Sequence, residues 1–166
     1  KWIKDHPYDE GEGWGLVPWS QEEMPVTEEM LQTASGDDVA LVILGRTAGE
    51  DQDNTDKPGS YKLTQTEEDL IRKVSSQFSR TAVILNVGNI IDMKWVREFD
   101  PAAVLYAWQG GQEGGNGVCD VLMGRVNPCG KLTDTIAEDI SDYPSTANFG
   151  DLQKNYYKED IYVGYR

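Results

Sequence analysis

The sequence contains few of the residues on which nucleophilic and metal chemistry usually depends. His6 is its one histidine, and Cys119 and Cys129 are its two cysteines. A Ser–His or Cys–His catalytic pair would therefore depend on a residue close to the amino terminus. A zinc site would have few nitrogen ligands to choose from. Two thiols without a CxxC motif do not make a disulfide framework, so we expect both to be buried or idle.

Positive charge and long apolar runs are scarce as well. The 15 Lys and Arg residues face 29 Asp and Glu residues, which leaves a formal net charge of −14. Nucleic acid and anionic membrane surfaces repel such a chain, so we expect neither as a partner. No apolar run approaches the roughly 20 residues of a membrane-spanning helix, and no signal peptide is visible. The chain starts at Lys1 rather than Met, and we expect a processed or excised piece.

Apolar runs alternate with helical patterns along the rest of the chain. The run Val39–Leu44 has no polar alternation, which predicts a strand buried on both faces. Thr64 and Glu67 have the spacing of a capping box and predict a helix over 65–79, with Leu70, Ile71, Val74 and Phe78 on its buried side. Further helices are expected over 27–34 (capped by Thr27, with Met30, Leu31 and Ala34 inside), 92–99 (capped by Asp92) and 117–124, and further strands over 81–87, 102–108, 131–137 and 161–165.

This order of elements predicts an α/β fold. Strands that alternate with helices through short loops form a mostly parallel sheet sandwiched between helices, with right-handed crossovers. We expect residues 39–166 to form this domain. Residues 1–38 are expected to be an irregular aromatic and acidic arm plus one helix, which packs on the sandwich or belongs to it.

A loop crowded with carboxylates follows the first strand. Arg46 ends the strand, and Glu50, Asp51, Asp53 and Asp56 follow. Chemistry in open α/β sheets collects where strands end. The spacing of the acids misses the EF-hand calcium pattern. The alternative is that one carboxylate performs acid/base work while the others are solvated or pair with Arg46. Glu50 is the best candidate for this work, because it follows a flexible glycine and Arg46 is near enough to bias it.

A second candidate loop, Gly110–Gly117, lies between the third strand and the next helix. Its glycine spacing fits neither common phosphate-binding pattern, and Glu113 would repel a phosphate. A loop that lines a neutral polyol pocket fits better, because backbone amides and Gln or Glu side chains satisfy hydroxyl groups. The candidate substrate-binding side chains at the strand ends and in this loop are Arg46, Trp108 and Gln112.

Six motifs that follow one another along the chain resemble those of a known protein family. They are GRTAGEDQDN, GSYKLT, LNVGNIIDMKWV, AVLYAWQGGQEGGNGVCDVLMGRVNPCGKLTDTIA, DYPSTANFGD and EDIYVGYR, in order from about residue 39 to residue 166. Together they closely resemble glycoside hydrolase family 3, and in particular the six-stranded α/β-sandwich domain of its bacterial β-glucosidases.

The resemblance implies a retaining hydrolase that acts on terminal, non-reducing β-D-glucosyl residues without a cofactor or a metal. It also implies a site between two domains, where a TIM-like barrel supplies an Asp nucleophile and the sandwich supplies the general acid/base. The matching residue here is Glu50, and Glu113 is the second choice. The chain shows neither a barrel nor the nucleophile segment. We therefore expect part of a larger enzyme that does not turn over substrate alone.

Two other classes of function remain open at this point. The chain would be a non-catalytic carbohydrate- or partner-binding module if it bound sugar without needing Glu50. It would be a nucleotide-binding α/β protein if a ligand lay beside Gly110–Gly115, against which the glycine spacing already counts.

Overall fold

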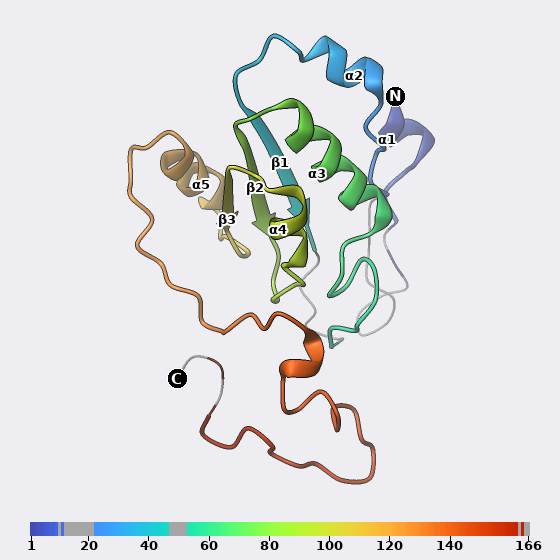
Figure 1. Ribbon diagram of the computed structural model, residues 1–166, viewed down its shortest axis with the longest axis vertical. Helices are drawn as coiled ribbons and strands as arrows, with labels where there is room; N and C mark the ends of the chain where they lie inside the picture. Colours follow the sequence, from blue (N-terminus) through green and yellow to red (C-terminus); the bar gives the residue numbers. More distant parts are fainter. Residues whose placement is uncertain (10, 12–21, 47–52, 163, 165–166) are drawn as a thin grey trace.

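The computed structural model describes residues 1–9, 11, 22–46, 53–162 and 164. These residues form a small α/β body with a long carboxy-terminal segment that runs beneath it (Figure 1). The elements, in chain order, are α1 (Trp2–Asp5), α2 (Glu28–Thr33), β1 (Ala40–Gly45), α3 (Gln65–Gln77), β2 (Thr81–Asn86), α4 (Lys94–Phe99), β3 (Ala103–Tyr106), α5 (Gly114–Leu122) and a 3-10 turn (Ile140–Asp142).

The three strands form one parallel sheet in the order β1-β2-β3. Val42 lies opposite Val83, and Ile84 lies opposite Leu105. A helix joins each pair of neighbouring strands, α3 between β1 and β2 and α4 between β2 and β3. This confirms the prediction of an α/β fold with a parallel sheet flanked by helices.

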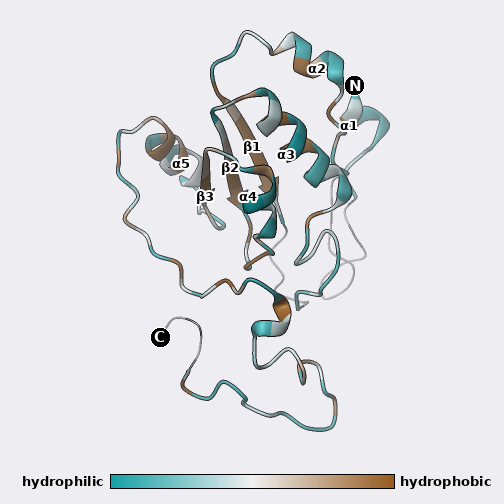
Figure 2. Ribbon diagram, in the orientation of Figure 1, coloured by the Kyte–Doolittle hydropathy of each residue, from teal (hydrophilic) through white to brown (hydrophobic). Residues whose placement is uncertain are grey.

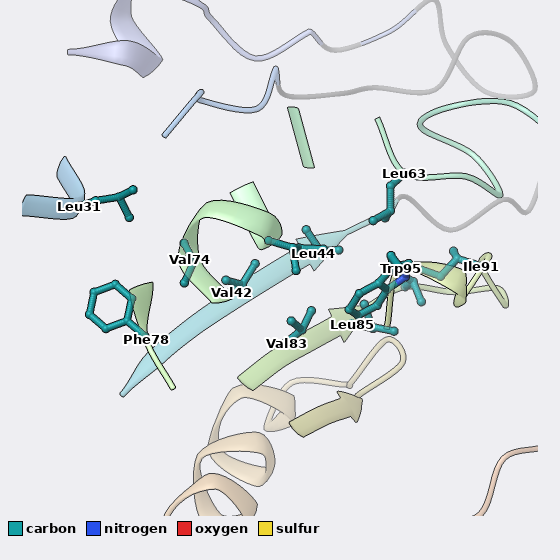
Figure 3. Packing of buried hydrophobic residues seen from close by; sticks show 12 residues of the cluster. Leu31, Val42, Leu44, Leu63, Val74, Phe78, Val83, Leu85, Ile91 and Trp95 are labelled. Atoms are coloured by element: carbon teal, nitrogen blue, oxygen red, sulfur yellow. The ribbon is translucent and has the colours of Figure 1, made fainter. Parts of the chain in front are cut away.

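The core lies between the sheet and helices α3 and α4. Alternate side chains of β1 and β2 point toward these helices, where Val42, Leu44 and Leu85 meet Val74 of α3 and Trp95 of α4 (Figure 3). The strands are the most hydrophobic part of the body, while α3 carries polar residues on its outer side (Figure 2). Burial of one such aliphatic side chain contributes about 1.5–3 kcal/mol, so this layer holds the fold together.

The other face of β1 is open, contrary to the prediction that this strand is buried on both faces. Leu41 and Ile43 are 54% and 64% exposed, whereas Leu44 is fully buried. β2 lies between two strands and does bury both faces, as Val83 and Ile84 show. An apolar run indicates that both faces of a strand can be buried. It does not indicate whether another element covers each face.

The two faces of β1 allow a matched test with the same substitution. We expect Leu44→Ala to lower the free energy of unfolding by about 2–5 kcal/mol, because it leaves a cavity in the core. Leu41→Ala changes an exposed side chain three residues away, and we expect a change within about 0.5 kcal/mol. Urea denaturation of the 166-residue chain measures both values. Equal losses would mean that the open face is covered in solution.

The predicted helix starts depend on local hydrogen bonds that the structure contains. Thr27 caps α2, since its Oγ1 accepts from Met30 N at 3.3 Å. Thr64 and Glu67 form the predicted capping box of α3. Asp92 accepts from Lys94 N at 2.9 Å, but α4 starts at Lys94 with Met93 as its N-cap residue, so the prediction that Asp92 is the cap was wrong by one position.

Some predictions about the helices and strands were wrong. Met30 is exposed, although Leu31 beside it is buried. α5 starts at Gly114 instead of Gly117, so the helix begins inside the glycine-rich loop. Residues 131–137 form no strand, because an alternating pattern needs a neighbouring strand and none lies beside them in the described parts of the chain. Ile161 and Tyr162 likewise lie outside any strand.

The arm contains a helix that the sequence did not predict, and both thiols are exposed. The arm contains α1, where Trp2 stacks on His6 with ring centroids 3.5 Å apart. The indole Nε1 of Trp2 donates to Glu22 O at 3.1 Å. Cys119 and Cys129 are free and exposed, so they are not buried, and the alternative that they are idle stays a prediction. In the part of the chain that the structure describes, no helix is long and apolar enough to cross a membrane.

Candidate functional site at the carboxyl edge of the sheet

The carboxyl ends of all three strands lie at one edge of the sheet, because the strands are parallel. Backbone pairing continues past the ends of β1 and β3. Arg46 N donates to Asn86 O at 3.2 Å, and Ala107 N donates to Leu85 O at 2.9 Å. The segments after β1 and β3 therefore leave the sheet at the same edge, on either side of β2, and this edge carries Arg46 and the start of the glycine-rich loop.

Arg46, a predicted substrate-binding residue, uses its whole guanidinium within the protein. Nη1 donates to Gly45 O at 2.8 Å, Nε to Ser60 O at 3.3 Å and Nη2 to Lys62 O at 3.4 Å. The remaining N–H groups form a bidentate pair with Glu67, whose Oε2 lies 2.8 Å from Nη2. These contacts engage all five N–H donors of an arginine.

Glu67 is the acid that pairs with Arg46, in place of an acid of the adjacent loop. Its side chain is 2% exposed, and that of Arg46 is 14% exposed. Glu67 Oε2 also accepts from Thr64 N at 2.7 Å as part of the capping box. One carboxylate thus ties the end of β1 to the start of α3.

The acids of the loop after β1 fall into two groups. Glu50 and Asp51 lie outside the described residues. Asp56 is exposed and pairs with Lys62 at 2.8 Å, and Asp53 is exposed. No group of three or more His, Cys, Asp or Glu side chains among the described residues is arranged to hold a metal ion.

Trp108 stands at the end of β3 in an unusual backbone conformation. Its φ angle is 57°, in the left-handed region. The indole lies against Tyr106, with ring centroids 4.4 Å apart and the rings tilted by 45°. The next residue, Gln109, crosses to the neighbouring loops: its Nε2 donates to Arg46 O at 3.4 Å, and its amide covers Gly88, where a Cβ atom would lie 3.0 Å from Gln109 Oε1.

Gln112 and Glu113 are both exposed at the start of α5. The Glu113 carboxylate accepts a hydrogen bond from Asn116 Nδ2, one turn along the helix. Gly110 has to be a glycine here, because a Cβ atom would lie 2.6 Å from Gly114 Cα. The glycines therefore permit the tight turn that presents these two side chains at the edge.

Tyr106 and Glu23, which no sequence pattern marks as candidates, both have raised pKa values. Burial raises the pKa of Tyr106 to about 12. The Tyr106 hydroxyl donates to Asn89 O at 2.9 Å and accepts from Ile91 N at 3.2 Å. Partial desolvation first, and then the charge of Glu67, raise the pKa of Glu23. No pattern in the sequence marks either contact, since each joins segments that are far apart along the chain.

The raised pKa of Tyr106 predicts a loss of stability in alkali. The folded state keeps this phenol protonated, whereas the unfolded chain ionises near pH 10. Its contribution is therefore complete below pH 10 and is lost as the pH rises toward about 12. Tyr106→Phe is expected to make the fall in unfolding free energy between pH 10 and 12 shallower than in the parent chain. Denaturant titrations at pH 8, 10 and 12 measure this, and an unchanged slope would contradict it.

Comparisons with known proteins agree on one family. The Glycosyl hydrolase family 3 C-terminal domain matches residues 21–165. A β-glucosidase of Ruminococcus albus is 55% identical over 166 residues, which cover 99% of this chain and 18% of that protein. β-Glucosidase A of Butyrivibrio fibrisolvens is 36% identical over 178 residues, covering 92% of this chain and 21% of that protein.

The fold leads to the same family. The structure of β-glucosidase 3B from Thermotoga neapolitana in complex with glucose superposes with a TM-score of 0.75 at 37% identity, covering 88% of this chain and 22% of that one. The chain thus spans about a fifth of the length of the relatives that it matches. With a family match over nearly all of its length, the chain belongs to glycoside hydrolase family 3, within the C-terminal domain of that family.

Proposed function

We propose that this chain is the α/β-sandwich part of a retaining β-glucosidase that hydrolyses terminal, non-reducing β-D-glucosyl residues. In this proposal Glu50 is the general acid/base, and a TIM-like barrel domain outside this chain supplies an Asp nucleophile. The 55% identity to a β-glucosidase over the whole chain carries the proposal. The solved relative in complex with glucose supports the sugar.

The proposed chemistry needs one carboxyl group that changes its protonation state during the reaction. As an acid, Glu50 gives its proton to the glycosidic oxygen while the barrel carboxylate attacks the anomeric carbon and the aglycone leaves. As a carboxylate, it then takes a proton from water, whose oxygen displaces the enzyme carboxylate and releases glucose. No cofactor takes part in either step.

The carboxyl edge supplies the other proposed roles. Trp108 and Gln112 stand at this edge and are proposed to contact the substrate, with Glu113 as the second choice for the acid/base. Arg46 was predicted to bind substrate as well. Because its five donors already have partners in the protein, we propose that it holds the end of β1 in place instead.

The test uses the full-length β-glucosidase to which we assign this chain, with 2,4-dinitrophenyl β-glucoside as substrate. In Glu50→Ala the covalent intermediate should accumulate, because no base activates water. Sodium azide needs no base, so it should raise kcat and form β-glucosyl azide. Neither effect should occur in the parent enzyme. Absence of both in the variant would contradict the assignment of Glu50.

A further inference from the structure

The segment that contains Glu50 has two described flanks, Arg46 on one side and Asn54 on the other. The Arg46 guanidinium donates to Ser60 O through Nε at 3.3 Å, in addition to its pair with Glu67. The backbone of Arg46 still pairs with β2 through Asn86 O. The first flank is therefore held by the sheet, by α3 and by Ser60 at once.

The second flank is held by the same residue. Ser60 Oγ donates to Asn54 Oδ1 at 3.4 Å and accepts from Thr55 N at 3.0 Å. Asn54 Nδ2 donates to Ile90 O at 3.1 Å, and Asn89 Nδ2 lies 3.5 Å from Asn54 Oδ1. Asn54 is thus bound to the turn at residue 60 and to the loop after β2.

Ser60 therefore connects both flanks: its main-chain oxygen holds Arg46, and its side-chain hydroxyl holds Asn54 and Thr55. The turn that presents Ser60 is fixed in its own right. Gly59 adopts a φ angle of 82°, and Tyr61 N donates to Thr55 O at 3.1 Å. The half-buried hydroxyl has two polar partners, and the main-chain oxygen of the same residue has a third, whereas a solvated serine would need none of them.

We propose that Ser60, together with Asn54 and the Arg46–Glu67 pair, is a positioning network for the general acid. The inference rests on the proposed role of Glu50. Arg46 and Asn54 are each four positions from Glu50 in the sequence, so fixing both restrains the two ends of the chain that carries the acid. Proton transfer depends steeply on the placement of the acid, since misplacement by about 1 Å costs on the order of 100-fold in rate.

The test separates placement of the acid from general damage by comparing two substrates in the full-length enzyme. Phenyl β-glucoside has a poor leaving group, so its cleavage needs a proton from the general acid. The aglycone of 2,4-dinitrophenyl β-glucoside departs as a stable anion without that proton. We expect Ser60→Ala to lower kcat/KM for the phenyl substrate by about 10-fold to 100-fold. For the dinitrophenyl substrate, which bypasses proton transfer, we expect a loss below about threefold.

Two further variants make the result decisive. Asn54→Ala removes the other side of the same contact and should reproduce the split between the two substrates. Ser76→Ala makes the same substitution on α3, where the hydroxyl donates only to Lys73 O, and should leave both values unchanged. A similar loss on both substrates in Ser60→Ala and Asn54→Ala, or no loss on either, would overturn the positioning proposal.

The reference variant Glu50→Ala distinguishes the two proposals. If it shows the split while Ser60→Ala and Asn54→Ala do not, the general acid is correctly assigned and the network does not position it. If Glu50→Ala shows no split, the proposed function fails at this residue, and the positioning role fails with it.

Discussion

Arg46→Ala is expected to lower the free energy of unfolding by about 3–5 kcal/mol. The reason lies in the partner that the substitution leaves behind. Glu67 is 2% exposed and would be left in the protein interior without the guanidinium that pairs with it. Breaking a buried pair by removing one member is costly because the remaining charge is neither paired nor hydrated. Urea denaturation at pH 7 measures the loss.

Two companion variants show whether the stranded charge is the cause. Glu67→Gln combined with Arg46→Met removes both charges while an amide oxygen can still accept from Thr64 N, so this double variant should recover most of the stability. Arg46→Lys keeps the charge and loses the bidentate geometry, so its loss should be smaller than that of Arg46→Ala. A loss below about 1 kcal/mol for Arg46→Ala is the size typical of solvated pairs, and it would show that water reaches this pair in solution.

Glu50→Ala in the full-length enzyme is expected to lower kcat/KM for phenyl β-glucoside by about 10²–10⁴-fold, the usual contribution of a general acid. Phenolate is a poor leaving group, so without a proton donor the glycosidic bond breaks slowly. For 2,4-dinitrophenyl β-glucoside the loss should be much smaller, because that aglycone leaves as a stable anion. Initial-rate kinetics on the two substrates measure the difference.

Asp53→Ala is the matched control for this prediction. It removes a carboxylate three residues away that is exposed. If that acid is solvated, as we predict for the remaining loop acids, kcat/KM should stay within about twofold of the parent enzyme on both substrates. A large loss in Asp53→Ala with little loss in Glu50→Ala would move the acid/base role to the other carboxylate.

Features set by neighbouring residues could be predicted from the sequence. The capping box of α3 depends on Thr64 and Glu67, which are three positions apart, and both of its hydrogen bonds form. The parallel order of β1, β2 and β3 follows from the helices that separate them in the chain. These features hold because the spacing along the chain already determines which atoms can meet.

Features that depend on distant segments could not be predicted. Glu67 pairs with Arg46 across 21 positions only because the end of β1 reaches the start of α3. The helix preferences of single residues also gave a wrong start for α5, because Gly114 and Gly115 lie inside the helix although glycine disfavours helices. The strand expected over 131–137 had the right alternation but has no strand beside it in the described residues.

The candidate site could likewise be predicted only in part. Ends of parallel strands share an edge, so the grouping of Arg46 and Trp108 at the carboxyl edge follows from fold class. The structural role of Arg46 does not follow from fold class, because its guanidinium donates to carbonyl groups of the turn at residues 60–62. A charged residue beside a predicted acid suggests a catalytic or substrate-binding role. Only the number of Arg46 N–H donors that already have partners in the protein shows that the residue has a structural role instead.

Among the residues that the structure describes, β1 is an edge strand, and no strand pairs with its outer row of backbone donors and acceptors. Leu41 and Ile43 of this strand are exposed. The run Ala40–Gly45 contains neither charge nor proline, the two features that usually keep such edges apart. Two copies can therefore meet edge to edge without unfolding. For this chain on its own, we expect any loss of monomer through this edge to rise with protein concentration, because it needs an encounter between two copies.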